Sequence, residues 1–215
     1  MAAVVVVVAV SVASLAAAGI LPSDQNVAER LTLKLSDFPT GGWRANSPPS
    51  TDPGKAHCTT QPKLDHALTG YSDSAGFEPT LAGGKRSAGS TTRVFSTSAA
   101  AETWYRWLAS GRKTACDLST ALASWKKHQP DFKVSRPRHL PETFAVRCSS
   151  CGAYRSSAWR WGFTVSRSGQ NDTTYVVDAV VVRKGRVVIS FAFFSVDTPF
   201  GSSGPQLVSK VLARG

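Results

Sequence analysis

The stretch WRWGFTVSRSGQNDTTYVVDAVVVRKGRVVISFAFFSV, residues 159–196, decides the fold. Apolar side chains take alternate positions at its start, which is typical of one face of a β-strand. Residues 168–173 (SGQNDT) predict a turn, and the β-branched run over 175–182 predicts a second strand. The pair Lys184-Gly185 predicts a tight hairpin turn into a third strand over 187–196. The stretch therefore predicts an antiparallel meander, and the apolar character of both faces of its last two strands requires cover on both sides.

Two helices are predicted upstream of this meander. Ser96-Thr97-Ser98 supplies capping residues for a helix that presents Trp104, Trp107 and Leu108 on one face and ends at Gly111. Thr114 is a candidate cap for a second helix, with an apolar face that includes Trp125, and Pro130 would end it.

The remaining segments carry weaker signals. A short helix is expected over 62–69, a strand over 144–148, and a C-terminal helix beginning near Pro205. Leu31, Leu33 and Leu35 alternate, but residues 27, 31 and 35 also share a helical face, so either element fits. The whole order predicts an α+β fold, a curved antiparallel sheet with helices packed on one face, in a single disulfide-stapled domain over residues 22–215.

Residues 1–21 contain no charged side chain. The run of valines and alanines forms an apolar region, and Ala16-Ala17-Ala18 offers the small residues that a signal peptidase requires. The segment is also long enough to span a bilayer. We therefore expect either a cleaved signal peptide or a single-span membrane anchor, with residues 22–215 outside the cytoplasm in both cases.

The charge of the chain is +11, with 42% hydrophobic and 18% charged residues. This composition is that of a folded globular protein and argues against disorder. A basic surface attracts polyanions, so an anionic lipid, an acidic wall polymer or an acidic envelope protein is an expected partner. No nucleic-acid-reading motif is present, and nucleic acid is not expected as a partner.

The four cysteines are Cys58, Cys116, Cys148 and Cys151. An even number in an exported chain indicates disulfides, and four cysteines allow three pairings. We favour Cys58–Cys116 with Cys148–Cys151, because the first bond would close the longer loop and restrict the unfolded chain most.

The sequence Cys148-Ser-Ser-Cys151 leaves three interpretations open. It could be a local structural staple, a redox pair or half of a metal site. A redox motif normally lies at the start of a helix, whereas the residues before Cys148 alternate as in a strand. No second ligand pair accompanies it, so a structural staple is favoured and no metal site is predicted.

Tryptophans and a few charged residues form the candidate ligand cleft. Trp159 and Trp161 share one strand face, and the helices contribute Trp104 and Trp107. Asp178 interrupts a buried strand and needs a partner, for which Arg160 on the neighbouring strand is the candidate. These aromatics could form a common core or line a cleft for a lipid or aromatic ligand, with Arg155, Arg160 and Arg183 suited to an anionic headgroup.

No catalytic constellation is evident in the sequence. There is no Gly-x-Ser-x-Gly elbow, no His-Glu-x-x-His and no phosphate-binding glycine loop. The four histidines lie in polar, loop-like or helix-end contexts. We therefore expect a protein that is not an enzyme, with no catalytic residue and no cofactor.

Several loose motifs resemble the secreted sensor-like domains of actinobacteria, a group that includes the extracellular domains of some mycobacterial membrane serine/threonine kinases. They are the exported N-terminus, LSDFPTGGW at residues 35–43, FSTSAAA at 95–101, Ala115-Cys116, and VVRKGRV at 181–187. The resemblance implies a mixed α/β module with two disulfides and a ligand-sized cleft. It also implies a free-standing sensor part, because the chain contains no kinase motif.

Three functions remain open on the sequence alone. The first is a non-enzymatic extracytoplasmic ligand-binding or sensor domain of the bacterial envelope, taking a small or amphipathic ligand. The second is an envelope carrier of an apolar or amphipathic lipid. The third is a secreted thiol-disulfide protein that uses Cys148 and Cys151.

Overall fold

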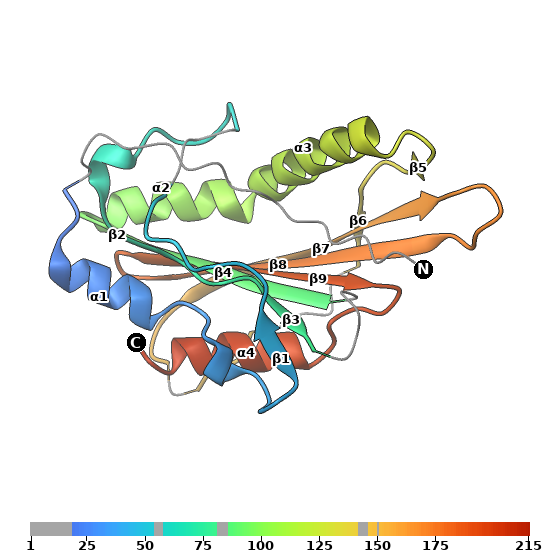
Figure 1. Cartoon of the computed structure of the whole chain (residues 1–215). Coiled ribbons are helices and arrows are strands. Elements are labelled where there is room, and N and C mark those ends of the chain that lie inside the picture. Colours follow the sequence, from blue (N-terminus) through green and yellow to red (C-terminus); the bar gives the residue numbers. More distant parts are fainter. Residues whose placement is uncertain (1–18, 54–57, 81–85, 142–145, 150) are drawn as a thin grey trace.

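The computed structural model describes residues 19–53, 58–80, 86–141, 146–149 and 151–215. It has an α+β fold built on one 9-stranded antiparallel sheet, with the main strand order β1-β3-β4-β9-β8-β7-β5, while β2 pairs with β4 and β6 pairs with β7 (Figure 1). The strands are β1 (Trp43–Ala45), β2 (Leu68–Asp73), β3 (Phe77–Pro79), β4 (Arg86–Phe95), β5 (Lys133–Val134), β6 (Arg138–Leu140), β7 (Arg155–Ser166), β8 (Thr173–Lys184) and β9 (Val187–Val196).

The predicted meander forms the centre of the sheet. β7 pairs with β8 from Arg155↔Arg183 to Val165↔Thr173, and β8 pairs with β9 over its whole length. Gly185 takes a left-handed conformation (φ 57°) in the tight turn between β8 and β9, which a glycine adopts without steric cost. The alternation and the turn signals of residues 159–196 are therefore confirmed.

Two helices cover one face of the sheet, namely α2 (Ser98–Ala109) and α3 (Arg112–His128) (Figure 1). The Thr97 side chain caps α2 by accepting a hydrogen bond from the backbone N–H of Ala100 at 3.1 Å. The prediction that Thr114 caps α3 was wrong, because the helix begins two residues earlier. Gly111, at φ 71°, makes the bend between the two helices, and the Thr114 hydroxyl lies inside the first turn of α3 and bonds to Trp159 instead.

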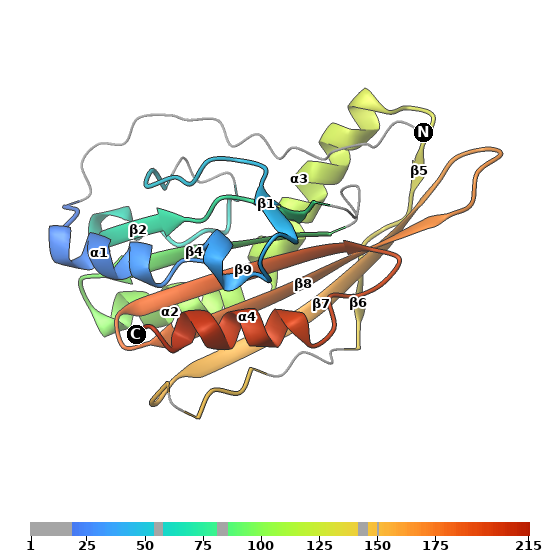
Figure 2. The same cartoon turned by 60° about the horizontal axis from the view of Figure 1, so that its bottom comes forward.

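A third helix, α4 (Ser203–Leu212), covers the opposite face of the sheet (Figure 2). Its apolar side contributes Val208 and Val211, both fully buried, to a core with Phe191 and Phe193 of β9. Helices therefore cover both faces of the sheet, and the expected α+β fold with helices packed on a curved antiparallel sheet is confirmed. The apolar pattern on both faces of β8 and β9 had required this second layer.

The N-terminal helix α1 (Pro22–Arg30) packs against β2 and β4. It approaches so closely that a Cβ on Gly70 would lie 2.4 Å from the backbone oxygen of Asp24. Neither interpretation of residues 31–35 was right. Residues 31–34 run without regular structure, and a short 3-10 helix, η1 (Leu35–Asp37), follows them.

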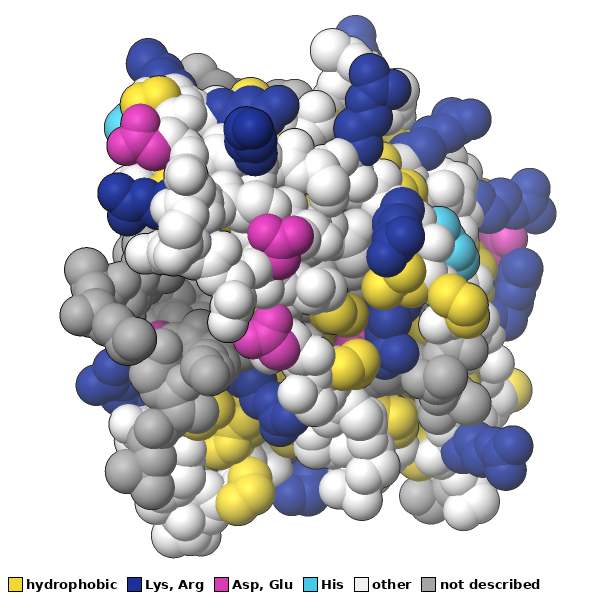
Figure 3. Space-filling view, turned by 90° about the vertical axis from the view of Figure 1, so that its right-hand side faces the viewer, with side chains coloured by type: hydrophobic (Ala, Val, Ile, Leu, Met, Phe, Trp, Pro, Cys, Tyr) yellow, Lys and Arg dark blue, Asp and Glu magenta, His cyan; other side chains and the backbone are white. Residues whose placement is uncertain are grey.

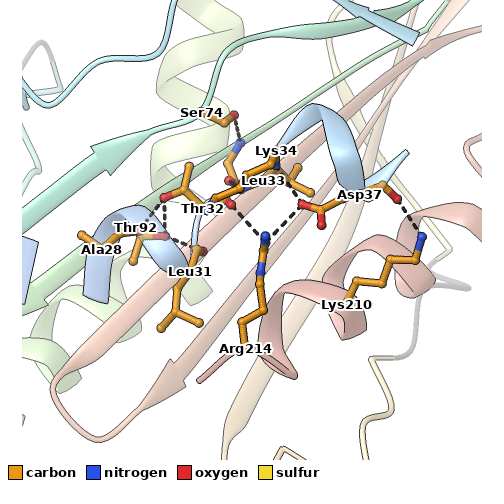
Figure 4. A network of polar contacts seen from close by, with 11 residues as sticks. Ala28, Leu31, Thr32, Leu33, Lys34, Asp37, Ser74, Thr92, Lys210 and Arg214 are labelled. Atoms are coloured by element: carbon orange, nitrogen blue, oxygen red, sulfur yellow. Dashed lines mark hydrogen bonds and ion pairs between the residues drawn. The ribbon is translucent and has the colours of Figure 1, made fainter. Parts of the chain in front are cut away.

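Side chains replace the missing backbone ladder of this segment (Figure 4). Thr92 donates to the carbonyl of Leu31 at 2.8 Å, and the N–H of Leu33 donates to Ser90 at 2.8 Å. Just beyond the end of α4, Arg214 donates to the Thr32 carbonyl at 3.0 Å and to the Asp37 carboxylate at 3.1 Å. The segment is therefore held between β4 and α4 although it forms no strand.

Two weaker predictions also need correction. The helix expected over 62–69 is a 3-10 turn, η2 (Asp65–Ala67), followed at once by β2. Residues 146–148 form no strand, and residues 142–145 of the predicted strand lie outside the described residues. Short strands at β5 and β6 pair with β7 instead.

Both favoured disulfides are present. Cys58–Cys116 joins the loop before β2 to α3 at a sequence separation of 58, and Cys148–Cys151 has a sequence separation of 3. The loop-closure model assigns about 4 kcal/mol to the first bond and about 2 kcal/mol to the second.

Within the described ranges, no helix has the length and apolarity needed to cross a bilayer. The predicted signal or anchor over 1–21 falls almost wholly outside those ranges.

Candidate functional site

An open cavity of about 630 Å³ lies where the junction of α2 and α3 meets the outer edge of β7. Its described lining comes from the helix junction, from β6, from β7 and from one residue before the second disulfide. These residues are Ala109, Ser110, Gly111, His139, Val146, Ser156, Ser157, Ala158, Trp159 and Trp161. The volume falls in the range of small-molecule sites, and the lining combines two indole rings with hydroxyl groups and an imidazole.

The left-handed turn at Gly111 positions the helix side of the cavity. A Cβ at Gly111 would lie 3.8 Å from the indole nitrogen of Trp159, so helix and strand approach closely here. Trp159 is buried, and its Nε1–H donates to the Thr114 hydroxyl at 3.2 Å. This bond holds the Trp159 ring against the first turn of α3. The ring lines the cavity at this point.

Trp161 forms the second aromatic wall and is half-buried. The edge of the His139 ring packs against it, with ring centroids 5.8 Å apart and planes at 85°. The pairing of β6 with β7 places His139 directly opposite Trp161. The Nε1–H of Trp161 is buried and makes no hydrogen bond within the described part of the chain.

The described lining carries no carboxylate. The start of α3 has no side-chain cap, so its first backbone N–H groups give this end a partial positive charge. Arg112 in the first turn is exposed and adds a full charge near the junction. The surroundings therefore suit a neutral or anionic polar molecule better than a cation.

The structure brings only two of the seven predicted cleft residues to this cavity, Trp159 and Trp161. Trp104 and Trp107 are 3% and 6% exposed, with ring centroids 5.0 Å apart, and belong to the core beneath α2. The helix and sheet tryptophans therefore meet largely as a common core, which was one of the two interpretations of the sequence.

Arg160 and Asp178 lie on the opposite face of the sheet from the cavity. They form the expected buried pair, with Arg160 Nε 2.5 Å from Asp178 Oδ1 and side-chain exposures of 9% and 1%. They occupy adjacent strands at register Arg160↔Asp178. The pair ties β7 to β8 under the α4 layer, away from the candidate ligand site.

Arg183 also lies outside the cavity. It contacts Glu102 of α2 at 3.1 Å, and the same carboxylate accepts bonds from Arg106 at 2.7 Å and from Arg155 at 2.8 Å. The hydrogen bond from Arg106 holds the pKa of Glu102 below its ordinary value, and the bond from Arg155 adds to this. The guanidinium groups of Arg155 and Arg183 therefore fasten α2 to β7 and β8, whereas the Arg106 bond lies within α2.

The Cys148–Cys151 pair borders a second open cavity, of about 600 Å³, beside α4. Cys151 is 3% exposed and packs in the core beneath α4, whereas Cys148 is half-buried. Neither cysteine lies in a helix, so no helix dipole acts on Cys148. This environment agrees with a structural staple and offers a redox function no specific support.

The described residues contain no assembled nucleophile and base. The His128 ring nitrogen lies 2.8 Å from the backbone oxygen of Ser124, and His139 packs on Trp161. Among these residues, Cys58, Cys116 and Asp117 have ligand atoms within 4.8 Å of one another, but both sulfurs belong to a disulfide. A disulfide sulfur is not the thiolate that a metal requires.

Sequence reasoning missed most of the cavity lining. Ser110, Ser156, Ser157 and His139 carry no local signal, because each is an ordinary polar residue in a turn or at a strand edge. Gly111 was noticed only as a helix end. The one usable signal was the alternation that placed Trp159 and Trp161 on the same face.

Comparisons with known proteins give little further information. No protein-family model matches the chain, and no curated protein matches it. Among solved structures, the extracellular domain of PknH from Mycobacterium tuberculosis is similar over 90% of this chain and 97% of that domain, at 11% identity and a TM-score of 0.41. That score is too low to support an argument about ligand or function, so the resemblance seen in the sequence motifs stays a prediction.

Proposed function

We propose that this protein is a non-enzymatic, extracytoplasmic sensor or binding domain, and that it takes a small polar ligand in the cavity between the α2–α3 junction and β7. The cavity itself carries the proposal. It combines two indoles, one fixed by Thr114, with the hydroxyl of Ser156. The Ser110 hydroxyl already donates to the Trp107 carbonyl at 2.6 Å and the Ser157 hydroxyl bonds to Tyr105 at 2.9 Å, so their oxygens retain lone pairs that can accept from a ligand. Such a lining offers a flat apolar wall and several directional polar groups to one small molecule.

Export is the second part of the proposal. The two disulfides and the charge-free N-terminal stretch favour an oxidising compartment outside the cytoplasm. The open, largely polar cavity favours a sensor or binder over a lipid carrier, because a carrier encloses apolar chains within an apolar cavity.

Native mass spectrometry of the exported, oxidised protein tests the proposal. We expect a noncovalent adduct that is lost on denaturation, and its mass would define the ligand class. The same protein should be screened by tryptophan fluorescence against small polar envelope metabolites. A bare protein together with no fluorescence response to any of these compounds would contradict the proposal.

A pair of variants tests the location. Trp161→Ala removes an aromatic wall of the cavity, whereas Trp125→Ala removes a half-buried tryptophan that lies outside it. We expect the first variant to weaken binding about tenfold or more and the second to leave it unchanged. Equal weakening in both variants would place the ligand elsewhere.

A further inference from the structure

One end of the molecule gathers exposed cations from four separate elements (Figure 3). This end is formed by the last turn of α3, by β5 and by the turn between β7 and β8 (Figure 1), and β6 follows β5 along the middle of β7. Its cationic side chains, here called the cationic end, are Lys126, Lys127, Lys133, Arg136, Arg138 and Arg167. All six are exposed, and Asp131 and Asp172 are the acidic residues of the same segments.

The cations of the cationic end differ from Arg160, Arg186 and Arg214, each of which is paired with a carboxylate. None of the six forms an ion pair with a carboxylate in the described ranges, and Arg167 instead lies over the Phe132 ring at 5.4 Å. Unneutralised charges on one region of a surface raise the local electrostatic potential, and they repel one another in the free protein. An external polyanion would relieve this repulsion.

Aromatic contacts tie together the elements that carry several of these charges. Trp125 and Phe132 lie 6.0 Å apart beneath them, and Trp125 meets Tyr175 of β8 edge-on at 5.6 Å. β5 is fastened to β7 through Lys133↔Ser166 and Val134↔Val165. The cationic side chains therefore project from fixed backbone positions.

We infer that the cationic end docks onto an anionic lipid surface. None of the six cations lines either of the two cavities described above. A linear polyanion is usually held along a positively charged groove. Cations that project from the end of a domain fit an extended sheet of headgroups, and each Lys or Arg held near an anionic membrane surface adds about 1 kcal/mol of attraction.

Vesicle co-sedimentation of the exported, oxidised domain of residues 22–215 tests this inference, because the apolar segment 1–21 could itself insert into any vesicle. The vesicles contain phosphatidylglycerol and phosphatidylcholine in about equal parts, or phosphatidylcholine alone. We expect binding to the anionic vesicles at about 0.1 M salt, its loss at about 0.5 M salt, and no binding to the neutral vesicles.

Two triple variants with the same charge change locate the surface. The first is Lys126→Gln, Lys127→Gln and Lys133→Gln on the cationic end. The control is Arg30→Gln, Lys34→Gln and Lys63→Gln, which removes exposed cations elsewhere. At about fivefold per side chain, the first variant should lose roughly a hundredfold in vesicle affinity, while the control keeps most of it.

Three results would overturn the inference. One is equal loss of affinity in both triple variants, which would reflect net charge alone. Another is the absence of binding to anionic vesicles by the native protein. The last is retention on a soluble polyanion, such as polyphosphate, without vesicle binding, which would assign the cationic end to a polymer. Ligand binding in the cavity is a separate readout, so either proposal can fail alone.

Discussion

The protein has two groups of cations in opposite environments. One consists of arginines that are paired with carboxylates, and the other is the cationic end. Arg160, Arg186 and Arg214 each reach a carboxylate from another element, at 2.5 to 3.1 Å. Lys126, Lys127, Lys133, Arg136 and Arg138 are exposed and form no such pair within the described ranges. The chain has 25 Lys and Arg but only 14 Asp and Glu, so the carboxylates cannot serve every cation.

The contrast teaches where this protein uses charge for stability. A paired, buried charge cannot lose its partner without a large cost in folding free energy, whereas an exposed, unpaired charge costs little to remove. Stability is therefore expected to depend strongly on the paired group and hardly at all on the cationic end. Three variants test this, from the largest expected effect to the smallest.

Asp178→Ala should have the largest effect. It leaves Arg160 buried without its carboxylate, and breaking such a pair from one side costs about 3 to 5 kcal/mol. Urea unfolding of the oxidised protein measures the free energy of unfolding. Asp172→Ala, at an exposed turn position, is the control and should stay within about 0.5 kcal/mol of the native protein. Similar values for both variants would contradict the structural role of the pair.

Asp24→Asn should have an intermediate effect that depends on pH. Arg186 donates to both Asp24 oxygens, at 3.0 and 3.1 Å, and this bonding lowers the pKa of Asp24 from its ordinary value of 3.8. A carboxyl whose folded-state pKa is depressed stabilises the fold above its unfolded-state pKa, and this contribution is lost as the pH falls through the folded-state pKa.

We therefore expect Asp24→Asn to cost about 1 to 3 kcal/mol at pH 7 and much less well below pH 3.8. The measurement is the free energy of unfolding of both proteins across this pH range. A difference between the two proteins that stays constant with pH would show that the ionised carboxylate is not responsible.

Lys126→Gln with Lys127→Gln should have the smallest effect. Both side chains are exposed and unpaired within the described ranges, so the free energy of unfolding should change by less than about 0.5 kcal/mol. Thermal unfolding followed by circular dichroism measures this. A loss of stability above 1 kcal/mol would show that these lysines are part of the folding core and would remove the contrast between the two regions.

Short-range patterns predicted the local elements well. The alternation from Trp159 to Val165 and the Lys184-Gly185 turn lie within a few residues of their causes, so the sequence displays them directly. The Thr97 cap belongs to the same class. The segment after α1 was misjudged because its backbone groups are satisfied by distant side chains such as Thr92 and Arg214, which no local pattern reveals.

The candidate cavity, like the segment after α1, depends on contacts between residues that are distant in sequence. Its walls come from residues that are up to 52 positions apart in sequence, from Ala109 to Trp161, and they meet because β7 passes the α2–α3 junction. Strand alternation in the sequence predicted that Trp159 and Arg160 lie on opposite faces of the sheet. Trp104 and Trp107 are buried and Trp161 is half-buried. This difference depends on how α2 and α3 pack on the sheet, which the sequence does not display.

The sequence by itself determined the α+β composition, the central meander, the apolar N-terminal stretch, the even set of cysteines and the excess of positive charge. Each of these follows from composition or from periodicities of two and of about four residues. Tertiary structure alone decided which charges are paired, which face each helix covers, and where the cavity opens. Those properties depend on the docking of distant elements, which brings together side chains that share no local pattern.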